Sequence, residues 1–304
     1  MQANQKTPMT TNNKDMYHAF AISALQEAEH GNVNAECTIA DCYMLGRGFE
    51  QNFPKAVLWY RKAAIAGNAY AQRRLGDMYA NSLGIKQNYE EALKWYRLGA
   101  NNADTGARFR LGLMYHIGHG IDKDYTEAFR WKLMAAEQGY FAAQFSVGLS
   151  CANGLGTKQD SAAALEWFYR AAEQNHAMAQ YSVGLAYEHG DGVAQDINEA
   201  FKWYKRAAYN DDYLAQVNLA VMYLNGLGAP KSDAQAYMWF SVAASQQDLL
   251  GLNKEQYKSL NHTISPERIK FLDEQVTTLR YHIAMRKPVN LFSMAIKKAE
   301  NAKP

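Results

Sequence analysis

The chain has 304 residues and carries 32 lysines and arginines against 30 aspartates and glutamates, which leaves a formal net charge of +2. Such a balance gives no general attraction to nucleic acid or to an anionic membrane surface, so we expect neither as a partner. No apolar run is long enough to cross a bilayer, so an integral membrane protein is not expected.

Residues 1–15 are polar and lack both the basic segment and the apolar run of a secretory signal. We expect a flexible arm here and a cytoplasmic protein; export by a route that needs no cleavable signal stays open. Residues 16–34 follow with a helix in which Ala28 and Gly31 fit the register of the repeats described next. This segment is predicted to be an N-terminal capping helix.

Between residues 35 and 246 the chain repeats itself six times. All six tryptophans stand 36 residues apart, at Trp59, Trp95, Trp131, Trp167, Trp203 and Trp239. Chance does not place the rarest side chain on such a ladder, and periods of about 20 to 50 residues are typical of repeat arrays. The spacing therefore predicts one continuous array of six repeats.

Each repeat is predicted to form two helices. In one repeat Ala107, Leu111 and Tyr115 lie on one helical face, and Gly118 stands where a helix end needs a left-handed residue. The second helix of every repeat is preceded by a side-chain acceptor suited to an N-cap: Asn52, Asn88, Asp124, Asp160, Asp196 and Ser232. Glu127, three residues after Asp124, predicts a reciprocal capping box. No stretch alternates with the period of a strand, so the predicted fold is all-α.

Beyond residue 246 the register ends. Pro266 follows Ser265, which is a good N-cap, and starts a helix whose apolar residues recur at spacings of three and four. Two heptads are short for a coiled coil, so we predict that residues 247–284 cap a monomeric array; a dimer seam is the alternative. Residues 285–304 form a basic tail, predicted to be a loose surface helix, with weak membrane or partner contact as its alternative.

The repeat pattern AxxxLGxxYxxGxG…DxxxAxxWYxxAA resembles the Sel1-like repeat family, which is related to the tetratricopeptide repeats. Residues 71–100, 107–136 and 179–208 carry the pattern most clearly. The resemblance implies an α-solenoid, a right-handed superhelix of antiparallel helix pairs whose first helices line the concave side. It also implies adaptor work, as in scaffolds of degradation and signalling complexes and in bacterial proteins that meet host or competitor proteins.

Two motifs suggest chemistry, and the register accounts for both. Residues 116–119 read His-Ile-Gly-His, the nucleotide-binding signature of class I aminoacyl-tRNA synthetases, but no strand precedes them and Gly118 belongs to the repeat. The Gly-x-Gly turns recur in step with the tryptophans, which indicates turns between helices rather than a phosphate cradle. We therefore expect no catalytic residue, metal or cofactor.

Residues that differ between repeats are the candidates for binding. We expect the inner face of the first helices to offer an arginine-rich end for carboxylates, formed by Arg73, Arg74, Arg108 and Arg110 with Asp77 beside them. The same face is expected to offer an apolar end with Phe109, Leu113, Phe145 and Tyr181. The alternative is that the aromatic residues pack between repeats and that the arginines form a solvated face partly paired with Asp77.

These features predict a non-enzymatic adaptor that binds a protein or peptide on the concave face, as a regulator, an immunity-type inhibitor or a host-interaction factor. Two alternatives remain: a structural protein that associates with itself, and the weak hydrolase activity ascribed to cysteine-rich relatives. This chain lacks the regular cysteine pair of those relatives and has only Cys37, Cys42 and Cys151. Cys37 and Cys42 lie five apart on one helix and point to different faces, which argues against a disulfide and favours a reducing compartment.

Overall fold

The computed structural model describes residues 11–247, 249 and 251–286. The predicted arm before residue 11 and the basic tail from residue 287 lie outside the described residues. Within them the chain is helical and contains no strand. In chain order the helices are α1 (Thr11–Glu29), α2 (Val33–Leu45), α3 (Phe53–Ile65), α4 (Ala69–Ala80), α5 (Tyr89–Asn101), α6 (Thr105–Ile117), α7 (Tyr125–Glu137), α8 (Phe141–Asn153), α9 (Ser161–Glu173), α10 (Ala177–His189), α11 (Ile197–Tyr209), α12 (Tyr213–Asn225), α13 (Asp233–Ala244), α14 (Gly251–Thr263) and α15 (Pro266–Arg286).

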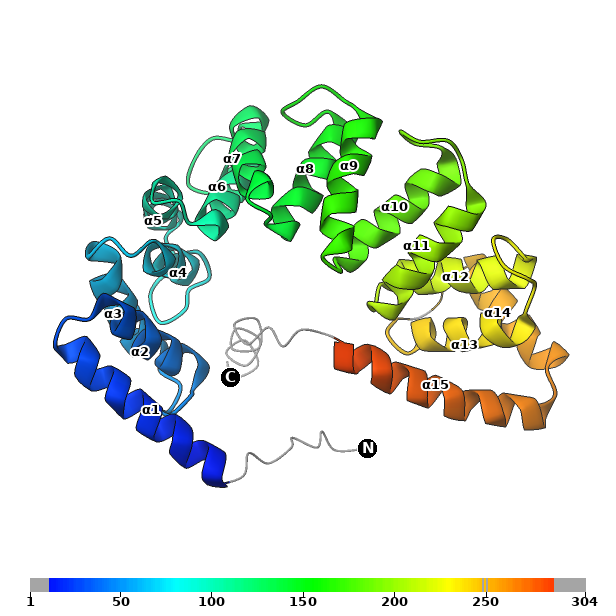
Figure 1. Ribbon diagram of the computed structural model, residues 1–304, viewed down its shortest axis with the longest axis horizontal. Coiled ribbons are helices and arrows are strands. Elements are labelled where there is room, and N and C mark those ends of the chain that lie inside the picture. The colour runs from blue at the N-terminus through cyan, green and yellow to red at the C-terminus, as the bar shows by residue number, and fades with distance from the viewer. Residues whose placement is uncertain (1–10, 248, 250, 287–304) are drawn as a thin grey trace. The chain divides into compact units, whose positions relative to one another are not determined.

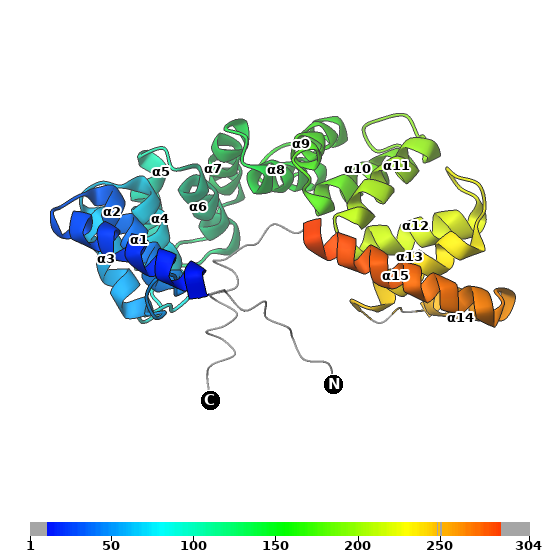
Figure 2. The ribbon, with the colours of Figure 1, turned by 60° about the horizontal axis from the view of Figure 1, so that its bottom comes forward.

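The six repeats are the helix pairs from α2–α3, repeat 1, to α12–α13, repeat 6, and together they form an α-solenoid (Figure 1). The described residues divide into two compact units within α7, between Met134 and Ala135. Unit 1 comprises residues 11–134 and unit 2 comprises residues 135–286. Within each unit the helix pairs stack in chain order, as the turned view shows (Figure 2).

In repeats 2, 4 and 5 the two helices approach closely because a glycine of the first helix lies under an aromatic ring of the second. A Cβ atom on Gly76 would stand 2.6 Å from Cε1 of Tyr96. Gly148 and Phe168, and Gly184 and Tyr204, repeat this contact in unit 2. A larger residue at these three positions would displace the ring or force the two helices apart.

The predicted helix ends are confirmed. The side chain of Asp124 accepts from the backbone N–H groups of Thr126 and Glu127, and the other five predicted N-caps make the equivalent bond. Gly118 is left-handed, with φ 87°, and its N–H donates to the carbonyl of Met114. In repeat 2 the same turn position is Ser82, which takes the left-handed φ of 57° without being glycine.

The prediction of a reciprocal capping box, in which the Glu127 carboxylate would accept from the backbone N–H of Asp124, is wrong. The N–H of Asp124 does not need the Glu127 carboxylate, because it donates to the carbonyl of Tyr115 at 2.9 Å. Every repeat makes this bond from its second N-cap back to the same position of its first helix. The glutamate is left to pair on its own helix surface, as Glu127 does with Arg130.

Helix α1 begins earlier than the sequence predicts. It starts at Thr11, so residues 11–15 belong to the helix rather than to the arm. It packs against α2 and buries Ala21 and Ala28. The backbone of Gly48 passes so close to α1 that a Cβ atom there would stand 2.3 Å from the carbonyl oxygen of Tyr17.

At the other end of the chain, α15 packs against α13. Ser265 caps the helix, since its hydroxyl accepts from the N–H of Arg268 at 3.3 Å. Leu272, Val276 and Ile283 are buried in the core that α12 and α13 also form. The apolar spacing that predicts either a cap or a dimer seam thus faces the chain's own last repeat.

Candidate binding face

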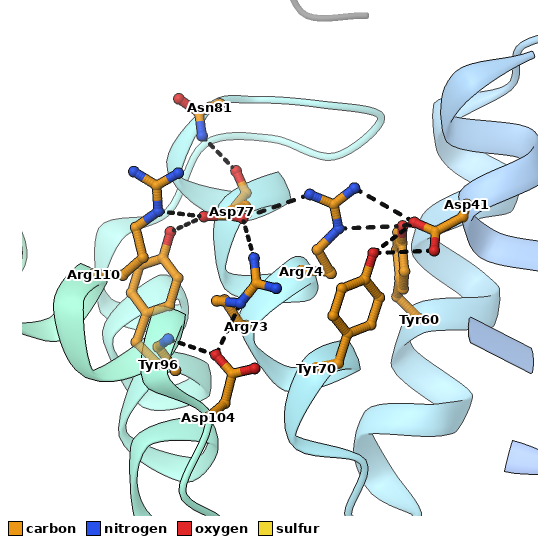
Figure 3. Close-up of polar contacts among 11 residues, drawn as sticks. Asp41, Tyr60, Tyr70, Arg73, Arg74, Asp77, Asn81, Tyr96, Asp104 and Arg110 are labelled. Carbon is orange, nitrogen blue, oxygen red and sulfur yellow. Dashed lines mark hydrogen bonds and ion pairs between the residues drawn. The ribbon is translucent and has the colours of Figure 1, made fainter. Parts of the chain in front are cut away.

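Six charged residues of unit 1 form a network across the first helices of repeats 1, 2 and 3 (Figure 3). We call this network the arginine–aspartate cluster, and its members are Asp41, Arg73, Arg74, Asp77, Asp104 and Arg110. They come from α2, from α4, from the turn before α6 and from α6. Three of the four predicted arginines are therefore brought together with Asp77.

Asp77 is the centre of this cluster and is 1% exposed. Its Oδ1 accepts from the hydroxyl of Tyr96 at 2.9 Å and lies 3.1 Å from Nε of Arg110. Its Oδ2 lies 3.7 Å from a guanidinium nitrogen of Arg73 and 4.0 Å from one of Arg74. One buried carboxylate thus faces three guanidinium groups, and this offsets the free energy that burial of a lone charge would cost.

The guanidinium group of Arg74 lies between Asp77 and Asp41, and its second terminal nitrogen is 3.4 Å from Oδ1 of Asp41. Asp41 also accepts from the hydroxyls of Tyr60 and Tyr70. Burial raises the pKa of Tyr70 to about 12, and the charge of Asp41 adds to the rise although Arg74 opposes it. The phenol therefore stays protonated at neutral pH and acts as a donor.

Arg73 joins two consecutive first helices. Its Nε donates to Oδ1 of Asp104 at 2.8 Å, and the same oxygen caps α6 by accepting from the N–H of Ala107. The guanidinium carbon of Arg73 also lies 5.0 Å from the ring centroid of Tyr70. The Arg73–Asp104 ion pair fixes the start of α6 relative to α4.

Burial contradicts the expectation of a solvated charged face for two of these residues. Arg74 is only 7% exposed and Asp77 is fully covered, whereas the Arg110 side chain is 41% exposed. Three arginines face three aspartates, so the charges of the cluster cancel. Arg110 and part of Arg73 are the cations that remain within reach of a partner.

Arg108 does not join the cluster. Its Nε donates to the carbonyl of Ala100 at 3.2 Å. Glutamine makes the same bond from this position in four other repeats, as Gln72 does to Ala64 and Gln144 to Ala136. The sequence could have indicated this role, because a glutamine recurs 23 residues before the tryptophan in those repeats and Arg108 occupies the same position. Arg108 therefore belongs to the scaffold.

The four predicted apolar residues are half-buried, with Phe109 and Leu113 in unit 1 and Phe145 and Tyr181 in unit 2. The Phe145 ring lies 5.7 Å from that of Phe168 and 4.7 Å from that of His176. Tyr181 lies 5.5 Å from Tyr204. In unit 2 the predicted residues thus pack on the second helix of their own repeat while part of each ring stays accessible.

Sequence reasoning missed the most exposed apolar residues of this face. On the first helices of unit 2, Met178 is 55% exposed and Leu214 is 52% exposed, and Phe141 and Leu149 are also exposed. In contrast, the described second helices α9, α11 and α13 expose no large hydrophobic side chain. The register holds the signal, since Met178 and Leu214 occupy the same repeat position, 25 residues before the tryptophan.

Two hollows lie beside these residues in unit 2. One, of about 340 Å³, is lined by α8, α9 and α10 and includes Leu149, Leu185 and Asp191. The other, of about 390 Å³, is lined by Phe141, Met178 and the end of α15 at Arg286. The apolar side chains therefore border concave surface into which a partner's side chains can fit.

The cysteines and the histidine motif occupy ordinary structural positions. Among the residues that the structure describes, no three His, Cys, Asp or Glu side chains are placed so that they could hold a metal ion. Cys37, Cys42 and Cys151 are free and buried, and burial raises the pKa of Cys37 to about 11, so its thiolate is scarce. His119 stacks on Tyr89 and His116 lies edge-on to Tyr125, which accounts for the histidine motif as turn packing.

None of the helices described between residues 11 and 286 combines the length and apolarity that crossing a membrane requires.

The family profile of the Sel1 repeat matches six consecutive segments, residues 34–68, 69–104, 105–140, 141–176, 177–212 and 214–248. The chain belongs to the Sel1 repeat family. The segments match the helix pairs from α2 to α13, so the tryptophan ladder and the family agree on the repeats. Sel1 repeat proteins are in general scaffolds for protein interaction and are typically not enzymes.

Two solved structures are similar over most of the chain. A Sel1 repeat protein from Oxalobacter formigenes has 28% sequence identity and a TM-score of 0.73, covering 82% of this chain and 74% of its own. A protective antigen with an SLR fold from uropathogenic Escherichia coli strains has 23% identity and a TM-score of 0.50, covering 96% of this chain and 78% of its own. No curated protein matches the chain.

Proposed function

We propose that this Sel1 repeat protein is a non-catalytic adaptor that binds a protein or peptide segment along the face of its first helices. The observation that carries the proposal is the distribution of exposed apolar side chains in unit 2. Met178, Leu214, Phe141 and Leu149 all lie on first helices, while the described second helices α9, α11 and α13 expose no large hydrophobic side chain. Exposed apolar groups gathered on one face are typical of an interaction surface.

The energetics favour a segment with apolar anchors. These side chains stand on helices rather than on loops, so the backbone of this protein loses little conformational entropy when a partner binds. The half-buried rings of Phe145 and Tyr181 extend the apolar area. In unit 1 the same face offers Arg110 and Arg73 as partners for carboxylates.

The roles of regulator, immunity-type inhibitor and host-interaction factor share this mode of binding. They differ only in which protein is bound. An experiment that maps the face and identifies the captured protein therefore tests the proposal and separates the roles.

The test is affinity capture with three purified proteins. The wild type is compared with the double variant Met178→Asp/Leu214→Asp and with Leu58→Asp, a control on the second helix α3 where the side chain is 67% exposed. We expect the same protein to be captured by the wild type and the control and to be lost with the double variant, at equal melting temperatures. Equal capture by all three would contradict the proposal.

A further inference from the structure

Repeat 3 departs from the others at the position that follows the tryptophan. Five repeats place an aromatic residue there, namely Tyr60, Tyr96, Phe168, Tyr204 and Phe240. Repeat 3 places Lys132 there, on α7, and the side chain is buried with 2% exposure. A lysine in a core position is costly unless its charge has a partner.

The aromatic residue of repeats 1 and 2 donates to an aspartate on the first helix of its own repeat. Tyr60 donates to Asp41, and Tyr96 donates to Asp77 at 2.9 Å. The residue of repeat 3 that corresponds to these aspartates is Leu113. Repeat 3 has thus exchanged a phenol for an ammonium, a stronger donor, and has lost the acceptor.

The stem of Lys132 crosses α6. A Cβ atom on Gly112 would stand 2.7 Å from Cγ of Lys132, so the lysine runs directly over this glycine. Further along α6, burial lowers the pKa of His116, and the charges of Lys132 and Lys123 lower it further. His116 therefore favours its neutral form and offers Lys132 no negative charge.

Burial alone lowers the pKa of Lys132 to about 8, with no contribution from a carboxylate of the described residues. Asp41 and Asp77, the acceptors of repeats 1 and 2, are each held by an arginine. Lys132 thus replaces Tyr60 and Tyr96 in the repeat pattern but lacks the acidic acceptor that repeats 1 and 2 provide.

We infer that Lys132 binds a carboxylate of the partner, which takes the place that Asp41 and Asp77 hold in repeats 1 and 2. The inference rests on the proposed function and specifies the partner's chemistry: a segment with an acidic side chain or a free C-terminus. The half-buried Phe109 and Leu113 lie on the same helix as the crossing point and supply apolar contact around the ion pair. A charge pair formed in such a dry site is stronger than one at the surface.

A peptide selection tests this inference. A displayed library of random peptides is selected against the wild type, against Lys132→Met, which keeps the stem, and against Lys132→Tyr, which restores the residue of repeats 1 and 2. Peptides enriched on the wild type are then synthesised with each acidic residue replaced by its amide, and with free or amidated C-termini. This step separates a side-chain carboxylate from a terminal one.

We expect wild-type peptides to share one carboxylate, and Lys132→Met to weaken their binding about 10- to 100-fold, as removal of a hydrogen bond to a charged group does. The amide analogue should bind wild type and variant equally. Calorimetry at pH 8 in buffers of different ionisation enthalpy should show proton uptake on binding to the wild type and none with Lys132→Met, because the carboxylate raises the pKa of the lysine.

Acidic peptides that bind the wild type and both Lys132 variants equally would overturn the inference and leave the proposed function intact. A selection that enriches no peptide on folded wild-type protein would overturn the proposed function and this inference with it. Circular dichroism of the variants checks the fold, and Lys132→Tyr, whose residue the fold already accommodates in repeats 1 and 2, keeps the comparison valid if Lys132→Met unfolds.

Discussion

Removal of the buried arginine of the cluster should destabilise unit 1 far more than removal of the exposed one. Arg74 and Arg110 both contact Asp77, but the Arg74 side chain is 8% exposed and the Arg110 side chain is 41% exposed. The substitutions Arg74→Met and Arg110→Met each delete one charge and keep an apolar stem. They form a matched pair that differs in burial.

The size of the effect follows from what each substitution leaves behind. Arg74→Met removes the cation that joins Asp41 to Asp77, and loss of one partner of a buried pair costs about 3–5 kcal/mol. Asp41 keeps the hydroxyls of Tyr60 and Tyr70, so we expect a cost near the lower end, about 3 kcal/mol. Solvent screens Arg110, which should cost about 1 kcal/mol or less.

Urea unfolding followed by far-UV circular dichroism and tryptophan fluorescence measures both values, with two probes because repeat arrays can unfold in steps. The account is refuted if Arg110→Met costs as much as Arg74→Met. This result also decides how the binding face can be probed. Replacement of all four arginines by glutamate would set new carboxylates against Asp41 and Asp77 and lower stability, so a loss of binding in that variant would not map the face.

Three further predictions concern the scaffold. Nδ1 of His176 caps α10 by accepting from the N–H of Ala179, and burial lowers the pKa of His176 below its ordinary 6.5. The cap's contribution to stability is therefore complete above about pH 6.5 and is lost as the pH falls below that value. His176→Asn should flatten the acid side of the curve of melting temperature against pH, and an unchanged curve would refute the assignment. Ala103 has a φ of 64° and occupies the same repeat position as the left-handed Gly139. Ala103→Gly should therefore raise the free energy of unfolding in urea, and Gly139→Ala should lower it, by about 1 kcal/mol each. Changes of the same sign in the two variants would be incompatible with this view. Leu272 of α15 is buried and its neighbour Phe271 is exposed, so Leu272→Ala should cost about 3 kcal/mol in urea unfolding and Phe271→Ala should have little effect. Both variants should be monomers by light scattering; a dimer that Leu272→Ala dissociates would favour the dimer seam.

Local rules explain which parts of the fold the sequence could predict. The turn at Gly118 and the cap at Asp124 depend on a few neighbouring residues, and the structure contains both as predicted. The capping box failed because the N–H of Asp124 found the carbonyl of Tyr115, nine residues away, on the preceding helix. Helix α1 extends to Thr11 although the segment lacks any apolar pattern, since α2 supplies the surface on which its later turns pack.

The sequence indicated which repeat positions vary, but not how their side chains pair. Register identified the positions that vary, but it could not show that Arg73 pairs with Asp104, 31 residues away, or that Arg74 is buried. Lys132 departs from the aromatic residue that follows the other tryptophans, but the sequence could not show that its side chain is buried over Gly112. Tertiary contacts of this kind have no signature in local spacing.

The central claim, that a partner lies along the first helices, is tested most directly by photo-crosslinking within unit 2. A benzophenone side chain is placed at Met178 on the first helix α10 or at Lys202 on the second helix α11, both exposed positions of the same repeat. The account predicts a covalent adduct with the bound protein or selected peptide from position 178 and none from position 202. Adducts from position 202 alone, or equally from both, would contradict it.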